Sequence, residues 1–162
     1  MTTMLIRNAR IVDGTSPEAT DPVDIHIESG RFTEVGKGLK LTADEELDLK
    51  GGIVMPGLID CHVHVIATSA NLGLNAELPD SLVALRSAQL MRNMLMRGFT
   101  TVRDLGGATR GLQMAVEEKL VEAPRLVICG KALSQTGGHT DYRGPFHNRD
   151  VSYYAEKLGT LG

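Results

Sequence analysis

The sequence predicts an α/β protein in two parts, a small β-sandwich segment over residues 1–55 and parallel βαβ units over residues 56–162. Three observations support this prediction. Apolar and polar residues alternate in the first part, a nearly continuous apolar run follows Pro56, and residues at helical spacing separate that run from later ones. The texture changes at Pro56, so we expect the boundary between the two parts there.

Short strands joined by tight turns are predicted for the first part. In "VDIHIES" apolar residues alternate with polar ones, which is typical of a half-buried strand and places Asp24 and His26 on its polar face. His26 is therefore expected to be an exposed strand residue without chemistry. Ser29-Gly30 predicts a hairpin turn into "RFTEV". Further strands are expected in "MLIRNARIV", "EELDLK" and "GGIVM", which together predict an antiparallel sheet or sandwich.

Strands and helices alternate after Pro56. The run "GLIDCHVHVI" is typical of a parallel strand that is covered on both faces. A helix is predicted from Asp80 or Ser81 as N-cap to Gly98 at the C′ position, because the apolar residues between them recur at helical spacing. The runs "FTTVRDL" and "RLVICG" are predicted strands, and "TRGLQMAVEEKLV" between them is a predicted helix that Pro124 ends. This order indicates parallel βαβ units.

Composition and charge exclude several classes of function. A chain of 162 residues with a net charge of −3 offers no cluster of basic residues for nucleic acid or an anionic membrane. No apolar run approaches the roughly 18 residues that suggest a membrane span. The N-terminus lacks the apolar core of a signal peptide, and Cys61 and Cys129 are too few for a disulfide framework. We therefore expect a cytoplasmic protein that binds neither nucleic acid nor a membrane.

His62 and His64 are the candidate metal ligands. Side chains at i and i+2 of a strand lie on the same face, so two imidazoles in this spacing can converge on one ion. Asp60 shares their parity and is a candidate to orient a ligand, whereas Cys61 is expected to pack on the opposite face. The alternative is a chance pair, in which each buried ring needs an ordinary hydrogen-bond partner or loses roughly 1–3 kcal/mol.

Four stretches extend the pattern beyond the histidine pair. "PGLIDCHVH", preceded by "LIRNARIVDG" and followed by "GFTTVRDLGG" and "SQTGGHTD", resembles the metal-dependent amidohydrolase superfamily. The match is to the branch of imidazolonepropionase-like enzymes, Xaa-Pro dipeptidases and ochratoxin-type amidases. The resemblance implies the N-terminal part of a TIM-like (β/α)8 barrel, and hydrolysis of an amide C–N bond by metal-activated water. Its implied substrates are dipeptides or N-acyl amino acids.

The resemblance assigns a functional role to only a few residues of this chain. It implies that His62 and His64 bind a divalent metal, with zinc as the first candidate and one or two ions, and that His139 contacts substrate. A loop histidine bonded to the backbone remains the alternative for His139. Asp104 is expected to have a structural role, such as capping the next helix, and His147 and Tyr142 are expected to be solvated loop residues. The family's remaining ligands and its general base cannot be assigned, so no catalytic residue is predicted in this segment.

The length of the chain conflicts with a complete barrel. An eight-stranded β/α barrel requires roughly 200 to 250 residues, and only about three of its repeats fit here. We expect the remainder of the barrel to come from a longer or a second chain, and the assembled protein to be a homo-oligomer. The alternative function is a non-catalytic structural or regulatory module on the same scaffold.

Overall fold

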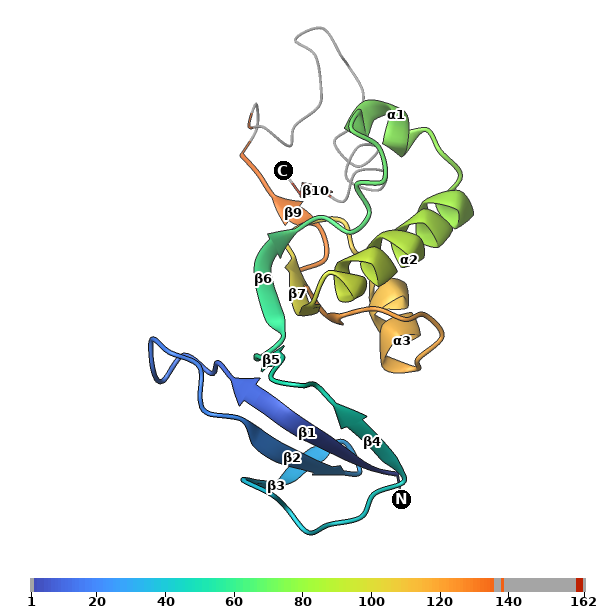
Figure 1. Cartoon of the computed structure of the whole chain (residues 1–162). Coiled ribbons are helices and arrows are strands. Elements are labelled where there is room, and N and C mark those ends of the chain that lie inside the picture. Colours follow the sequence, from blue (N-terminus) through green and yellow to red (C-terminus); the bar gives the residue numbers. More distant parts are fainter. Residues whose placement is uncertain (1, 136–137, 139–159, 162) are drawn as a thin grey trace, which may run out of the picture. The chain divides into compact units, whose positions relative to one another are not determined.

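The computed structural model describes residues 2–135, 138 and 160–161, and the chain divides into two compact units, Met1–Pro56 and Gly57–Gly162 (Figure 1). The elements of the first unit are β1 (Thr3–Ile11), β2 (Val23–Glu28), β3 (Arg31–Gly36), β4 (Glu45–Asp48) and β5 (Ile53–Val54). Those of the second are β6 (Leu58–Val63), α1 (Leu72–Ala76), α2 (Asp80–Met96), β7 (Phe99–Asp104), α3 (Arg110–Glu117), β8 (Arg125–Ile128), β9 (Ala132–Leu133) and β10 (Thr160–Leu161). No helix in the described part of the chain is both long and apolar enough to cross a bilayer.

The first unit is a five-stranded sheet with the order β3-β2-β1-β4, in which β5 also pairs with β1. β1, β2 and β3 are antiparallel, but β4 and β5 run parallel to β1. The predicted antiparallel arrangement is therefore wrong for two of the strands. The reason is the connection: residues 37–44 return the chain along the sheet, so that β4 starts beside Met4 instead of forming another hairpin.

The β2–β3 hairpin forms at the predicted turn. Ser29 and Gly30 have φ values of 51° and 74°, the left-handed conformation that a two-residue turn of this kind requires at both positions. His26 is half-buried on this hairpin, and its Nδ1 lies 2.7 Å from Thr33 Oγ1. The ring thus has a partner within the sheet, and His26 is less exposed than the alternation predicts.

Asp24 is buried, contrary to the alternation that places it on the polar face. Its residue is 6% exposed, and its carboxylate accepts hydrogen bonds from the Asn8 N–H (3.1 Å), Arg7 Nη1 (2.9 Å) and the Leu39 N–H (3.0 Å). The register of β1 and β2 shifts between Ile6 and Ala9, where Asn8 has a φ of 53°. Burial acts to raise the pKa of Asp24, but these hydrogen bonds outweigh it and hold the pKa below its usual value.

The second unit contains a parallel three-stranded sheet with the order β6-β7-β8, and α2 and α3 lie on the same side of it (Figure 1). Its core lies between the sheet and these helices, and it consists of Val63, Val65, Met91, Val102, Ala108 and Leu126. The predicted succession of parallel strands and helices is therefore present. This arrangement brings the carboxyl ends of the three strands to one edge of the sheet.

The ends of the two longer helices are set by residues with positive φ, and not by the end of the apolar pattern. α2 begins at Asp80 with Pro79 as N-cap, and ends before Gly98, whose φ of 91° fits the predicted C′ position. α3 ends at Glu117 because Lys119 adopts a φ of 59°, so Pro124 is not what ends it. α1 has no counterpart among the predicted elements.

Candidate metal site

The histidine pair lies at the carboxyl end of β6. His62 belongs to the strand and His64 follows its last residue, Val63, and both side chains are exposed. The chain there alternates between exposed His62 and His64 and buried Val63 and Val65, which pack under the helices. The apolar residues of "HVHV" thus anchor this end of the strand, and the two rings are left on the opposite face.

The ring geometry fits two ligands of one metal ion. The ring centroids of His62 and His64 are 5.4 Å apart, and the rings are inclined by 75°. With Zn–N bonds of about 2.0–2.1 Å and tetrahedral angles, two imidazoles on one zinc ion have centroids roughly 5 Å apart. Neutral imidazole nitrogens suit zinc, and also iron, copper and nickel. The residues present therefore fit the imidazole part of a metal site.

A backbone carbonyl fixes the ring of His64. His64 Nδ1 lies 3.2 Å from the carbonyl oxygen of Gly106, in the turn after β7. A carbonyl only accepts hydrogen bonds, so this contact requires the proton on Nδ1 and leaves the lone pair of Nε2 free. Histidines that bind metals commonly donate their other ring N–H in this way.

Asp60 does not share the face of the two histidines. Asp60 pairs with Val102 and Val63 pairs with Asp104, and directly paired residues lie on one face. Val63, Val102 and Asp104 are all buried on the helical side of the sheet, so Asp60, the partner of Val102, also faces that side. Asp60 and Val63 thus share a face although they are three residues apart. The register shift between Asp60 and Val63 is a bulge that breaks the alternation on which the prediction rested.

The side chain of Asp60 instead accepts a hydrogen bond from the His62 N–H at 3.0 Å. The same bulge exposes Cys61, which was expected to pack against the helices. Cys61 contributes its backbone carbonyl, which accepts a hydrogen bond of 3.0 Å from Arg103 Nε on β7.

Asp104 is structural, as expected, but it is not a helix cap. Its carboxylate is fully buried and accepts hydrogen bonds from three backbone N–H groups, those of Val65, Gly106 and Ala108. The N-cap of α3 is Thr109. This carboxylate joins the end of β6 to the turn after β7. The sequence did not predict this link, although the Gly106-Gly107 pair after Asp104 is a signal for a close backbone approach.

His62 and His64 have no third partner of metal-binding type within the described residues, where no group of three or more His, Cys, Asp or Glu side chains could hold an ion. Catalytic zinc sites usually have three protein ligands. The predicted substrate contact, His139, lies outside the described residues, as do Tyr142 and His147.

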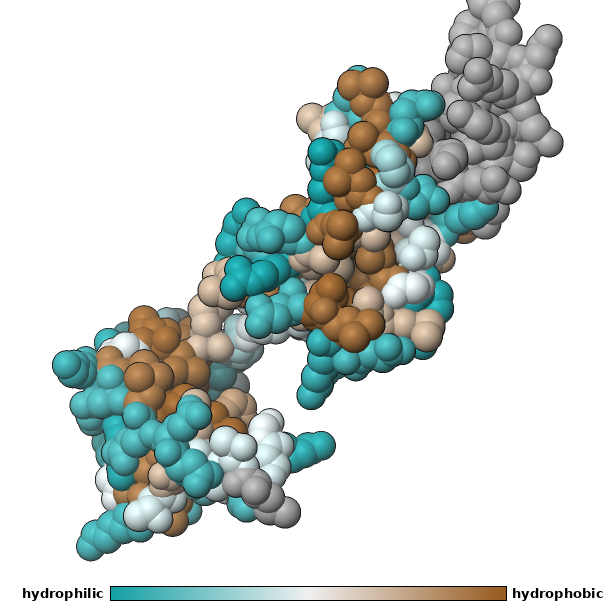
Figure 2. Space-filling model, turned by 90° about the vertical axis from the view of Figure 1, so that its right-hand side faces the viewer, coloured by the Kyte–Doolittle hydropathy of each residue, from teal (hydrophilic) through white to brown (hydrophobic). Residues whose placement is uncertain are grey.

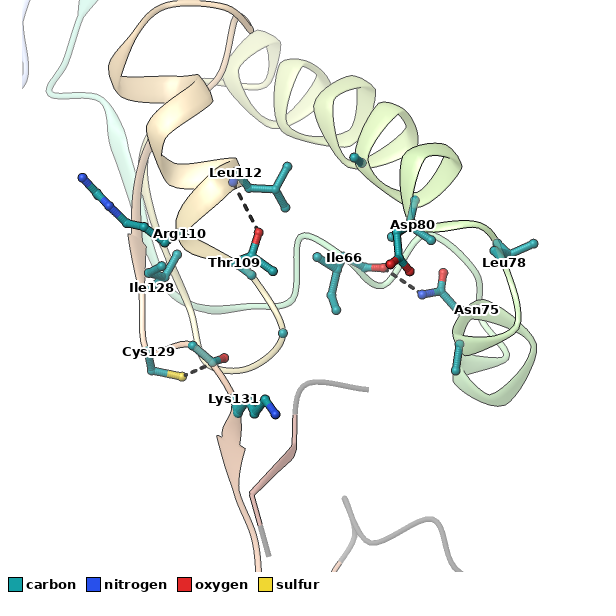
Figure 3. Close-up of a pocket in the computed structure, with 16 residues that line it drawn as sticks. Ile66, Asn75, Leu78, Asp80, Thr109, Arg110, Leu112, Ile128, Cys129 and Lys131 are labelled. Atoms are coloured by element: carbon teal, nitrogen blue, oxygen red, sulfur yellow. Dashed lines mark hydrogen bonds between the residues drawn. The ribbon is translucent and has the colours of Figure 1, made fainter. Parts of the chain in front are cut away.

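A pocket of about 630 Å³ lies apart from the histidine pair, on the helical side of the sheet (Figure 3). Residues of α1, α2 and the start of α3 line it together with Cys129, Gly130 and Lys131 after β8. Neither His62 nor His64 is among the lining residues. In Figure 3, Asn75 Nδ2 donates to the Ile66 carbonyl (3.1 Å), which ties α1 to the segment after β6.

Comparison with known proteins assigns this arrangement to a family. The model of the amidohydrolase family matches residues 53–159, which is most of the chain. The chain therefore belongs to the amidohydrolase family.

The solved structures that resemble the chain agree with this assignment. A prolidase crystallised with N-methylphosphonate-L-proline superposes on 98% of this chain with a TM-score of 0.89 and 39% identity. A Xaa-Pro dipeptidase with bound methionine matches 93% of it with a TM-score of 0.73 and 27% identity. Ochratoxinase from A. niger, at 23% identity and a TM-score of 0.73, shares the fold. The predicted family branch and the α/β, TIM-like fold class are thus confirmed.

The chain spans only part of these proteins. It covers 40% of the prolidase chain and 38% of the Xaa-Pro dipeptidase chain. Among curated relatives, the imidazolonepropionase of Vibrio vulnificus (strain YJ016) is 40% identical over 67 residues, which are 39% of this chain and 16% of that protein. The barrel of the family is therefore only partly covered by this chain.

Proposed function

We propose that the whole protein is a metal-dependent hydrolase that cleaves an amide C–N bond in a dipeptide or an N-acyl amino acid. The observation that carries this proposal is the pair of imidazoles at the carboxyl end of β6, with ring centroids 5.4 Å apart. The contact of His64 Nδ1 with the Gly106 carbonyl adds to it, because it leaves Nε2 available to a ligand.

His62 and His64 would hold the divalent metal, for which zinc is the first candidate, with one or two ions in the site. A bound ion of this kind lowers the pKa of a water molecule and polarises the amide carbonyl. His139 is the proposed substrate-binding residue. The exposed position of both imidazoles leaves room on the same face for further ligands and for substrate.

The substrate class rests on the structural neighbours. Two of the neighbours that cover nearly the whole chain are named as a prolidase and a Xaa-Pro dipeptidase, which supports a small peptide or related amide as substrate. Curated relatives with other names, such as imidazolonepropionase, match a much smaller share of the chain. A panel of dipeptides that includes Xaa-Pro sequences is therefore the first choice for activity assays.

The proposed barrel needs further strands. Ile59 and Val127, on the outer strands β6 and β8, are 66% and 42% exposed, and Figure 2 shows apolar side chains at the surface of the unit. Exposed apolar side chains on edge strands favour pairing with other strands. We propose that these come from the same polypeptide or from a second one, in a homo-oligomeric enzyme with a small-molecule substrate.

The test is to measure bound metal and dipeptide hydrolysis in the whole protein and in its His62→Ala and His64→Ala variants. Each variant is expected to lose most of its metal, and its kcat/KM is expected to fall by at least about 1,000-fold, because catalytic zinc usually has only three protein ligands and each variant removes one proposed ligand. His26→Ala is the matched control, since His26 bonds to Thr33 in the other unit. Unchanged metal content and turnover in both ligand variants would refute the proposal.

The same experiment distinguishes the alternative of a non-catalytic module. The lack of a third ligand within the described residues is the observation that favours such a module. A protein that binds metal through His62 and His64 but hydrolyses none of the amides, with all barrel strands present, would support the module over the enzyme.

A further inference from the structure

Asp104 is a buried carboxylate with an unusual set of partners. It is the last residue of β7 and is 0% exposed. Its Oδ2 accepts a hydrogen bond from the Val65 N–H at 2.7 Å, and its Oδ1 accepts from the N–H groups of Gly106 (2.9 Å) and Ala108 (3.2 Å). No ion pair with Asp104 occurs among the described side chains. A buried carboxylate is costly unless hydrogen bonds compensate it, so backbone donors alone hold this one.

These donors belong to the two segments that determine where the His64 ring lies. Val65 directly follows His64 just after the end of β6, and Gly106 supplies the carbonyl oxygen that His64 Nδ1 contacts at 3.2 Å. One oxygen of Asp104 therefore holds the backbone that carries the ring, and the other holds the turn that orients the ring. The Leu105 N–H adds a direct link between the segments, because it donates to the Val63 carbonyl at 3.1 Å.

The turn after β7 is also held from its other side. The Gly107 N–H donates to the Gly130 carbonyl at 2.8 Å, and Gly106 lies so close to Ala132 that a Cβ on it would come within 2.5 Å of the Cβ of Ala132. The Gly106 carbonyl is thus a fixed acceptor instead of a loop group free to follow the ring. A fixed acceptor selects the tautomer and the orientation of a histidine that binds a metal.

We propose that Asp104 is a positioning residue for the metal ligand His64. Through Val65 and Gly106 it holds the ring with the proton on Nδ1, so that Nε2 would be available to the ion. This inference rests on the proposed function, because it assumes that His64 binds a metal. Asp104 is fully buried and would touch neither the ion nor the substrate, so its effect on hydrolysis would pass through the geometry of His64.

Asp104→Asn is the variant that tests the role. The amide keeps one acceptor oxygen but presents N–H donors to backbone N–H groups, so it cannot satisfy both Val65 and the turn. We expect zinc affinity, measured by competition with a chromophoric chelator in the whole protein, to fall by about 10- to 100-fold. Asp24→Asn is the matched control, because it also removes a buried carboxylate but lies in the other unit, and it is expected to leave zinc affinity unchanged.

A second measurement does not depend on activity, and its first part needs no variant. In metal-free wild-type protein labelled with ¹⁵N-histidine at pH 8, the nitrogen shifts of His64 should report a proton on Nδ1, as the Gly106 contact requires. In Asp104→Asn the same signals should move toward a mixture of tautomers. A wild-type proton on Nε2, or zinc affinity and tautomer both unchanged in the variant, would overturn the proposal.

The outcomes also separate this inference from the proposed function. If His62→Ala and His64→Ala bind zinc like the wild type, the metal site is wrong, and with it the inference. If those two variants lose zinc while Asp104→Asn retains wild-type affinity, the site stands and only the positioning role of Asp104 is refuted.

Discussion

At the scale of single residues, Gly106 shows how a missing side chain supports the site. A Cβ on Gly106 would lie 2.5 Å from the Cβ of Ala132 and 3.3 Å from its Cα, and backbone atoms cannot move aside cheaply. Gly106→Ala is therefore expected to lower the free energy of unfolding by about 1–3 kcal/mol, as overpacking does in cores. Chemical denaturation followed by circular dichroism measures this change.

Gly111 offers the control for this substitution. It lies in α3, and a Cβ there would have its nearest neighbour, Thr109 Oγ1, at an ordinary distance of 3.7 Å. Gly111→Ala should thus leave stability unchanged or raise it by about 0.5–1 kcal/mol, because alanine favours the helix. Equal destabilisation by both substitutions would show that the close packing against Ala132 is not what requires glycine at position 106.

At the scale of elements, the ion pair between Arg7 of β1 and Asp24 of β2 makes the stability of the first unit sensitive to acid. Asp24 has a pKa below its usual value, so its contribution to stability is fully present above the unfolded value of about 3.9 and is lost as pH falls through the lower folded value. Asp24→Asn should lower the free energy of unfolding by about 2 kcal/mol at pH 7, since it weakens hydrogen bonds to a charged group. The difference from the wild type should shrink below about pH 4.

Urea denaturation between pH 3 and pH 8 tests this pH dependence. Asp21→Asn is the control, because the Asp21–Lys37 pair is on the surface, with side chains that are 78% and 68% exposed, and such pairs contribute little. A constant gap between Asp24→Asn and the wild type down to pH 3 would argue against a depressed pKa of Asp24.

The elements that the sequence predicted correctly are those with a repeating apolar pattern or a specific turn signal. α2 followed from the spacing of its apolar residues and from Gly98, and the β2–β3 hairpin followed from Ser29-Gly30. α1 has only five residues and depends on tertiary contacts, since Asn75 Oδ1 accepts from the Thr68 hydroxyl at 2.7 Å. A helix of this length carries too little periodicity to be recognised.

Two of the bulges explain why Asp24 and Asp60 were assigned to the wrong faces of their strands. A period of two assumes unbroken pairing, and one extra residue moves every later side chain to the other face. The shift between Ile6 and Ala9 gave Asp24 a buried role, and the shift between Asp60 and Val63 separated Asp60 from His62 and His64. The pair His62 and His64 was predictable because exposed and buried residues alternate without interruption from His62 to Val65. The Asp104 network joins backbone groups, which no side-chain pattern displays.

At the scale of the whole molecule, the two units should respond differently to a metal. A ligand that binds only the folded state stabilises the unit that contains its binding site. The free energy of unfolding of that unit rises by about 2.7 kcal/mol at a free ligand concentration of 100 times Kd. Both proposed ligands lie in the unit Gly57–Gly162. Zinc should therefore slow hydrogen exchange in this unit and leave exchange in the unit Met1–Pro56 nearly unchanged.

Four backbone N–H groups are suitable reporters, because each donates to a buried carboxylate. Val65 and Gly106 donate to Asp104, and Asn8 and Leu39 donate to Asp24. Exchange is measured by NMR with zinc and with EDTA, and with His64→Ala as the variant that should lose the effect. Equal protection of all four groups by zinc would mean that the units unfold together. Protection that persists in His64→Ala would place the ion elsewhere in the protein.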